Sequence, residues 1–219
     1  MHSLGDMAAG SSLAQLVEAC RHCHDCPLHL RATQAVFGEG PAPAAIMLVG
    51  EQPGDEEDRR GHPFVGPAGA LLEAALIAAG LSREDVYLTN AVKHFKFTER
   101  GKRRLHEKPN GREIRACRQW LLRELLLVAP RVVVALGATA ASSLLGGRIR
   151  VMSARGRILT LPIAGLEAPV TSVLTIHPSA ALRAPSPERR HALRAMLVAD
   201  LALAAHTAAA GAAAHAAQY

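Results

Sequence analysis

Short apolar segments alternate with helical patterns along most of this chain, and this alternation limits the fold more than any other feature. Four of the apolar segments are rich in β-branched residues and end in turn or polar residues, at 45–50, 86–90, 132–137 and 171–177. Runs of this length and composition are typical of strands that are buried on both faces of a parallel sheet. A further segment, 157–161, is a candidate edge strand.

The segments between these runs have the periodicity of helices. Helical patterns occupy 68–79, 112–128, 138–145 and 188–205. The first of them follows Pro67 and stops at Gly80, which is the usual chemistry of a helix start and end. Strands and helices in alternation predict a three-layer α/β/α sandwich with a central parallel sheet, built as a single domain. We expect about ten residues at the amino end, and the Ala-rich tail after His206, to be frayed.

Basic residues are concentrated in one part of the chain. The segment 93–118 holds ten basic and three acidic residues, a local net charge of +7, which leaves the rest of the chain at −1 against a total of +6. The basic residues are Lys93, Lys96, Arg100, Lys102, Arg103, Arg104, Lys108, Arg112, Arg115 and Arg118. A basic segment on a neutral body favours a polyanionic partner such as nucleic acid. A solvated loop that only aids solubility explains the charge equally well.

Membrane and secretion signals are not evident. We find no apolar run as long as a bilayer-spanning helix, and the amino end lacks the basic and apolar regions of a signal peptide. A cytoplasmic protein without membrane association is the default expectation.

Four cysteines suggest a metal centre. Cys20, Cys23 and Cys26 are spaced by two residues each, and Cys117 lies far along the chain. A disulfide scaffold does not suit a cytoplasmic domain of this size. Clustered thiolates suit zinc or an iron–sulfur cluster, and spacing alone does not decide between them. Buried structural cysteines are the alternative.

Chemically active side chains follow the predicted strands. In α/β sheets of this kind the ligand crevice lies at the carboxyl ends of the strands. Glu51 and Asp55 bring carboxylates to this edge after the first strand, and His177 brings an imidazole after the last. Each is weak evidence by itself, because a carboxylate in a turn is more often a cap than a catalyst. Together they are predicted to face one another across the edge of the sheet.

Several motifs at these strand ends have a recognisable order. GEQPGD, GHPFVGPAG, LTNAVKHFKF and TIHPS, together with the early CxxC and TQAVFGEG, resemble the uracil-DNA glycosylase superfamily, and more narrowly its iron–sulfur family-four branch. The KRRLH loop at 102–106 resembles the insertion of the UdgX-type branch, which becomes covalently bonded to the DNA whose uracil it removes. The resemblance extends from Cys23 to Leu203 and implies uracil-containing DNA, with single strands preferred, as the partner of a monomeric enzyme.

The resemblance implies a role for each residue of a uracil pocket. Phe64 would stack on the extruded base, Asn90 would read its edge, and Gln52 would contact it through the backbone. His177 would stabilise the negative charge that develops on uracil O2. Ser179 would grip the DNA backbone. Such a pocket suits base excision, which requires the nucleotide to leave the stack.

A second group of residues would act on the sugar and the DNA strand. The resemblance implies His106 as the nucleophile that captures C1′ of the sugar, with Glu51 and Asp55 as catalytic carboxylates nearby. The basic residues of the loop, Lys102, Arg103 and Arg104, would bind DNA, and Arg104 would hold the loop or a phosphate. Charge and spacing alone would instead favour a surface histidine at 106. A conventional turnover glycosylase and a non-catalytic cluster-bearing DNA-binding protein are the alternative functions.

The resemblance also implies a 4Fe–4S cluster with a modified ligand set. In the family a cysteine follows the Asn-x-Val-Lys stretch, and this chain has His94 there. The implied ligands are therefore Cys23, Cys26, His94 and Cys117, and histidine ligation of iron–sulfur centres is known. Cys20 in place of His94 is the alternative.

Overall fold

The centre of the protein is a sheet of mostly parallel strands. The computed structural model describes residues 12–147, 149–162 and 169–216. The sheet has the order β2-β1-β5-β7-β6. Its strands are β1 (Ile46–Gly50), β2 (Val86–Asn90), β5 (Val132–Leu136), β6 (Ile158–Leu161) and β7 (Val170–Thr175). The first four strands in this order are parallel, and β6 is antiparallel to β7. The predicted parallel sheet is thus confirmed, with an antiparallel strand added at the edge.

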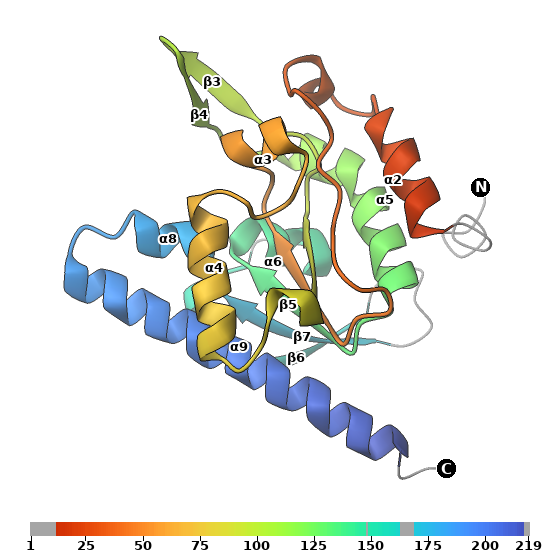
Figure 1. Cartoon of the computed structure of the whole chain (residues 1–219), viewed down its shortest axis with the longest axis vertical. Coiled ribbons are helices and arrows are strands. Elements are labelled where there is room, and N and C mark those ends of the chain that lie inside the picture. Colours follow the sequence, from red (N-terminus) through yellow and green to blue (C-terminus); the bar gives the residue numbers. More distant parts are fainter. Residues whose placement is uncertain (1–11, 148, 163–168, 217–219) are drawn as a thin grey trace.

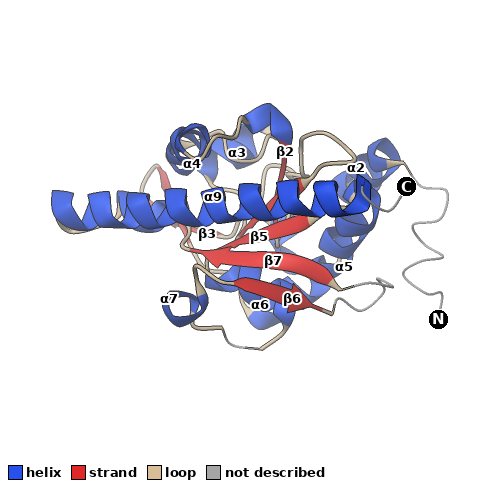
Figure 2. Ribbon diagram, turned by 90° about the horizontal axis from the view of Figure 1, so that it is seen from below, coloured by secondary structure: helices blue, strands red, loops and turns tan. Residues whose placement is uncertain are grey.

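Helices cover both faces of this sheet (Figures 1 and 2). One face carries α4 (Pro67–Ala78), α8 (Pro178–Leu182) and α9 (Pro187–Ala216), and the other carries α5 (Gly111–Val128) and α6 (Ala138–Leu145), with α2 (Leu13–Arg21) packed on α5. Successive side chains of a strand point to opposite faces. Ile46 and Leu48 accordingly pack with α4 and α9, while Met47 and Val49 pack with α5 and α6. The three-layer α/β/α sandwich is confirmed.

Shorter elements connect the strands and helices. They are α3 (Asp55–Arg60), α7 (Val151–Ala154) and two 3-10 turns at Pro27–Leu30 and Arg83–Asp85. A two-stranded antiparallel hairpin, β3 (Phe97–Arg100) and β4 (Arg103–His106), turns at Gly101, whose φ of 60° suits glycine. The hairpin projects from the body beside α3 (Figure 1). The sequence did not predict this hairpin.

The last helix is longer than predicted. Instead of ending near Ala205, α9 continues to Ala216, through the Ala-rich tail that was expected to be frayed. Alanine has the highest helix propensity of all residues, so helix can continue without an apolar pattern. The predicted fraying of the amino end lies outside the described residues.

By length and composition α9 could cross a membrane, contrary to the expectation that no segment of the chain would be long and apolar enough. Leu193, Leu197 and Leu201 are buried in the core against the sheet. One side of α9 is thus packed in the core.

Candidate active site

A cavity of about 730 Å³ opens at the carboxyl ends of β1 and β2. It is lined by Glu51, Gln52, Gly54, Glu57, Phe64, Ala68, Asn90, Leu105, His106, Lys108, His177, Ser179 and Arg183. Seven of these are residues for which the sequence predicted a role in catalysis, uracil recognition or DNA contact, and they come from well-separated parts of the chain. Asp55, Lys102, Arg103 and Arg104 do not line the cavity.

Close packing shapes the cavity where β1 ends. A Cβ added to Gly50 would lie 2.3 Å from Oδ1 of Asn90 and 2.6 Å from Cζ of Phe64. Only glycine at this position lets both side chains close over the end of β1. A Cβ at Gly69 would lie 1.8 Å from the carbonyl oxygen of Phe64, so that residue is also restricted to glycine.

Phe64 has a backbone conformation that is unusual for an aromatic residue. Its φ is 56°, in the left-handed region that side chains with a Cβ disfavour. Arg83 donates to the carbonyl oxygens of Pro63 (2.7 Å) and Phe64 (3.1 Å) and so holds this turn. Strained conformations of this kind persist where surrounding contacts fix them, often at functional sites. Arg83 was not predicted from the sequence, because its role depends on a contact between distant segments.

Glu57 closes the loop that carries Phe64. Its side chain is buried and accepts from the backbone N–H groups of Gly54 (3.0 Å) and Gly66 (2.8 Å). One carboxylate therefore fixes both ends of the segment between β1 and α4. Glu57 was not predicted either, since nothing in the sequence distinguishes it from the other acidic residues at 55–58.

His177 is a neutral hydrogen-bond donor at the cavity wall. The backbone N–H of Ser179 donates to its Nδ1 (3.2 Å), so the proton of the neutral ring is on Nε2. Burial lowers the pKa of His177 to about 4, and Arg183 and His106 act in the same direction. The ring centroids of His177 and Phe64 are 6.3 Å apart. The hydroxyl of Ser179 also contacts Nδ1 (2.8 Å), so this serine orients the imidazole.

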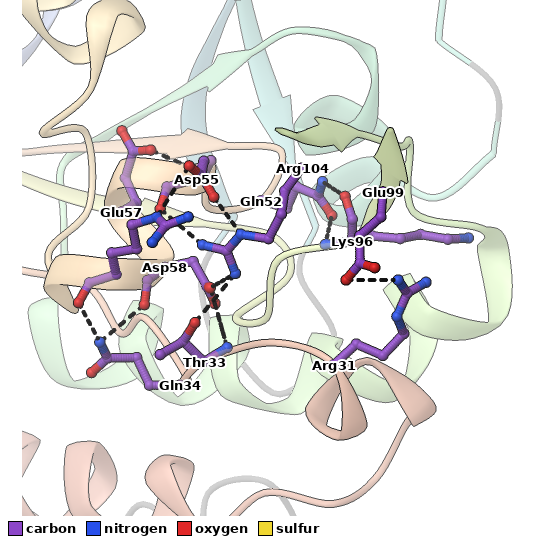
Figure 3. Close-up of polar contacts among 12 residues, drawn as sticks. Arg31, Thr33, Gln34, Gln52, Asp55, Glu57, Asp58, Lys96, Glu99 and Arg104 are labelled. Carbon is purple, nitrogen blue, oxygen red and sulfur yellow. Dashed lines mark hydrogen bonds and ion pairs between the residues drawn. The ribbon is translucent and has the colours of Figure 1, made fainter. Parts of the chain in front are cut away.

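Arg104 points inward from the hairpin (Figure 3). Its side chain is 14% exposed and forms ion pairs with Asp55 (2.5 Å) and the fully buried Asp58 (2.6 Å) of α3. The guanidinium also lies over the rings of Phe95 and Phe97, at 5.5 and 4.9 Å from their centroids. Of the two roles expected for Arg104, the structure places it where it holds the loop. The carboxylate of Asp55 is engaged in this anchor.

Gln52 forms a second link between β1 and the hairpin. Its side-chain amide donates to the carbonyl oxygens of Lys96 (3.1 Å) and Glu107 (3.0 Å) and accepts from the N–H of Lys96 (3.1 Å). Lys96 precedes β3 and Glu107 follows β4, and Figure 3 shows Gln52 beside Lys96. The Gln52 side chain thus positions the hairpin, a role that the sequence did not predict.

His106 and Glu51 lie next to each other in the wall of the cavity. Nε2 of His106 lies 3.4 Å from Oε1 of Glu51. Although 46% of the His106 side chain is exposed, partial burial lowers its pKa below the ordinary value of 6.5; Glu51 opposes this effect and Arg183 reinforces it. The imidazole is therefore neutral at pH 7, with a lone pair available on one nitrogen. Arg183, which was not predicted from the sequence, acts on both cavity histidines.

The basic segment is divided between the interior and the surface. Lys93 is fully buried and pairs with Glu124, and Lys96 pairs with Glu107 and Glu113. Together with Arg104, these cations are neutralised inside the protein, which corrects the prediction that the whole segment offers its charge to a polyanion. The exposed cations are Arg100, Lys102, Arg103, Lys108, Arg112 and Arg115.

The four cysteines belong to one buried apolar cluster between α2, α5 and the loop that joins Cys20 to Cys26. Trp120 Nε1 donates to Cys23 Sγ and the N–H of Lys93 donates to Cys117 Sγ, both at 3.2 Å. Such N–H contacts to sulfur are typical of iron–sulfur ligands. Within the described ranges, no three His, Cys, Asp or Glu side chains are grouped closely enough to hold a metal ion.

His94 and Cys20 differ in their neighbours. His94 is buried, which lowers its pKa to about 4, and the charged groups that act on it are His29, Asp58 and His24. Burial raises the pKa of the Cys20 thiol; among the charged groups that act on it, Lys93 lowers this pKa and Cys117 and Cys23 raise it. The donor set of four buried thiols and one buried imidazole thus fits an iron–sulfur group chemically, while the geometry favours neither residue as the fourth ligand.

Comparison with known proteins identifies relatives of this chain. Residues 37–202 match the Uracil DNA glycosylase superfamily. A type-4 uracil-DNA glycosylase of Pyrobaculum aerophilum is 38% identical over 195 residues, which cover 87% of this chain and 92% of the relative. A type-4 uracil-DNA glycosylase of Thermotoga maritima is 40% identical over 185 residues, covering 84% and 88%. A type-5 enzyme of Thermus thermophilus is 39% identical over 125 residues, covering 50% and 53%. The chain belongs to the uracil-DNA glycosylase superfamily.

Proposed function

We propose that the protein excises uracil from DNA and then becomes covalently linked through His106 to C1′ of the sugar. The observation that carries the proposal is the meeting of Phe64, Asn90 and His177 with the facing pair Glu51 and His106 around one cavity. The names of the type-4 relatives support the first step. The second step rests on the neutral imidazole that the hairpin holds at the cavity.

Recognition and cleavage use the base end of the cavity. A flipped uracil would stack on Phe64 and present its edge to the amide of Asn90. Cleavage breaks the bond between C1′ and N1 of uracil, and the electron pair leaves with the base. The Nε2–H of neutral His177 donates to the charge that develops on O2, and a donor fixed in advance is the most effective kind.

Capture uses the sugar end. A lone pair on one imidazole nitrogen of His106 forms the new bond to C1′ as the base departs. The proton on the other nitrogen leaves to solvent and the uracil anion takes one up, so charge is balanced. Glu51 orients the ring through its contact with Nε2. Oriented groups reach effective molarities of roughly 10⁵–10⁸ M, which allows the imidazole to compete with water at about 55 M.

A conventional turnover glycosylase is the second candidate, because the relatives are named simply as uracil-DNA glycosylases. In that case water captures the sugar and the product is an abasic site. The two candidates share Phe64, Asn90 and His177, and they differ in the role of His106.

One gel separates them. Wild type, His106→Ser and Asn90→Ala are incubated with labelled uracil-containing DNA and run under denaturing conditions, with and without alkali. We expect wild type to give a shifted band that survives denaturation. His106→Ser should give alkali-labile abasic sites without that band, and Asn90→Ala should lose both products. Turnover by wild type without a shifted band would reject the capture step, and intact uracil in wild type would reject both steps.

We further propose that Cys23, Cys26, His94 and Cys117 hold a 4Fe–4S cluster, with Cys20 as the alternative to His94. The cluster would cross-link α2, the end of β2 and α5, which is a structural contribution. Purified protein should be brown and contain about four iron atoms per chain. Loss of iron in His94→Ala but not in Cys20→Ala would support the proposed set, and the reverse would exchange the two. Colourless protein with stoichiometric zinc would reject the cluster.

The remaining expectations concern the setting of the reaction. We propose a single-domain, monomeric, cytoplasmic enzyme that prefers single-stranded DNA, because unpaired uracil needs no energy for unpairing before it is flipped. Rates on matched single- and double-stranded oligonucleotides test this preference.

A further inference from the structure

The first turn of α6 contacts Glu51, one of the residues that line the cavity. The helix begins after Gly137, whose φ of 92° and close approach to His177 require glycine: an added Cβ would lie 3.1 Å from that of His177. Thr139 follows as the second residue of the helix and is 3% exposed. Its hydroxyl donates to Oε2 of Glu51. Strands β1 and β5 are neighbours in the sheet, which brings these two segments together.

The two oxygens of the Glu51 carboxylate have different partners. Oε2 accepts from Thr139 on α6, and Oε1 lies 3.4 Å from Nε2 of His106 on the hairpin. The last torsion of a glutamate side chain has broad minima, so an isolated carboxylate would rotate freely. A donor on one oxygen fixes the direction in which the other oxygen points.

The hydroxyl of Thr139 has no local use in its own helix. In a helix interior a threonine hydroxyl can donate to a carbonyl three or four residues earlier. At the second helical position those carbonyls belong to the end of β5 instead. The hydroxyl is therefore available to Glu51.

We infer that Thr139 is a positioning residue for covalent capture: it holds the Glu51 carboxylate so that this carboxylate orients His106. The inference rests on the proposed function and adds to it the residue that sets the geometry of the nucleophile. Small displacements of positioned groups have large kinetic effects, on the order of a hundredfold per ångström. In the proposed mechanism, uracil release depends on Phe64, Asn90 and His177. The hydrogen bond of the Thr139 hydroxyl goes to Glu51 and to none of these three residues.

The test measures how cleaved DNA is divided between two products. Thr139→Val replaces the hydroxyl with a methyl group of similar size. We expect the rate constant of covalent capture to fall roughly tenfold to a hundredfold. Uracil release and the DNA concentration for half-saturation should stay near wild type, so the fraction of alkali-labile abasic sites should rise. Thr139→Ser keeps the hydroxyl and should restore the division of products seen in wild type.

Matched controls make each outcome decisive. Ser142→Ala removes a hydroxyl from the same helix, one turn further from Glu51, and should behave as wild type. If Thr139→Val melts at a lower temperature, Thr139→Ala provides a second variant with the same expected change in products. A product ratio unchanged from wild type, or an equal loss of release and capture, would overturn the inference. Failure of wild type to form any covalent band would instead refute the proposed function, so the two failures are distinguishable.

Discussion

At the scale of single residues, the cavity holds two histidines that are both neutral at pH 7 for a shared reason. Burial lowers the pKa of His177 to about 4 and lowers that of His106 below 6.5, and Arg183 reinforces both shifts. The two rings nevertheless have different tasks in the proposal. His177, with its Nδ1 occupied by Ser179, can only donate from Nε2. Neutral His106 keeps a lone pair on one ring nitrogen, which can form the bond to C1′ of the sugar.

The pH dependence of capture follows from the lowered pKa of His106. Protonation removes the lone pair, so capture should be lost as pH falls through this pKa, and the acid limb should lie below pH 6.5. Arg183→Gln removes a cation that disfavours protonation, so the pKa should rise and the limb should move to higher pH. Single-turnover rates between pH 4.5 and 9 measure the limb.

Arg131→Gln, at the opposite end of the sheet before β5, is the matched control and should leave the limb in place. An acid limb at or above pH 6.5 in wild type would contradict the assignment. So would a shift to lower pH in Arg183→Gln.

At the scale of elements, the hairpin of β3 and β4 depends on contacts outside itself. Its strands carry exposed polar residues, and a two-stranded ribbon alone is marginally stable in water. Arg104 anchors it to Asp55 and Asp58 of α3, and Gln52 anchors its base to β1. The position of His106, at the end of β4, is set by these links.

Removing the anchor should therefore affect stability and capture together. Arg104→Ala leaves the carboxylate of Asp58 buried without its ion-pair partner, which costs about 3 kcal/mol in the free energy of unfolding. Denaturant unfolding measures this loss, and a denaturing gel should show less covalent product per uracil released. Arg103→Ala, one residue away and exposed, is the control. Equal behaviour of the two variants would contradict the anchoring role.

Local signals explain which elements could be predicted from the sequence. The helices α4, α5 and α6 were predicted to within one residue at each end because their start and stop residues, such as Pro67 and Gly80, are adjacent to them. The hairpin has a local signal only at its turn, Gly101, while its mostly exposed strands lack the apolar alternation that predicts strands. Its position is stabilised by Asp55 and Asp58 from another segment. The extension of α9 to Ala216 reflects alanine propensity, which a search for apolar periodicity does not detect.

The same distinction applies to the site. Glu51, Asn90 and His177 could be placed because each directly follows or ends a strand at the carboxyl edge of the sheet. Thr139 also follows a strand at this edge, β5, but its role could not be predicted because it depends on a hydrogen bond to Glu51 from another segment. Arg183 could not be placed, because it acts on the two histidines from a distant segment. Three-dimensional contacts also show that the carboxylate of Asp55, which was expected to be catalytic, is paired with Arg104, and that Arg104 holds the loop.

At the scale of the whole molecule, the positive surface charge of the basic segment comes from its exposed cations. Lys93, Lys96 and Arg104 do not contribute to it, because each is paired with carboxylates. Binding to DNA should weaken as salt rises, because cations that neutralise phosphates release counterions. The logarithm of the DNA-binding constant should fall linearly with the logarithm of the salt concentration. The double variant Lys102→Gln/Arg103→Gln should make this slope less steep by about 0.7 to 0.9 for each phosphate that the protein no longer neutralises. Fluorescence anisotropy at several salt concentrations provides the slopes.

The control removes the same charge elsewhere. Arg189→Gln/Arg190→Gln at the exposed start of α9 should leave the slope unchanged. If both double variants change the slope equally, the effect comes from total charge and the hairpin is not the DNA-binding surface.

The central claim is that His106 captures the sugar, and peptide mass spectrometry of the covalent complex tests it most directly. After the DNA is trimmed with nuclease, trypsin cuts behind Arg104 and Arg112, while the bond before Pro109 resists cleavage. Residues 105–112 are then released as one peptide that contains a single histidine.

We expect this peptide to carry the mass of the deoxyribose remnant, with fragment ions that place it on His106. Free uracil should be released in a one-to-one ratio with the modified peptide, and His106→Ser should yield the peptide unmodified. A covalent complex in which this peptide is unmodified, with the sugar on Glu51 or His177 instead, would contradict the account.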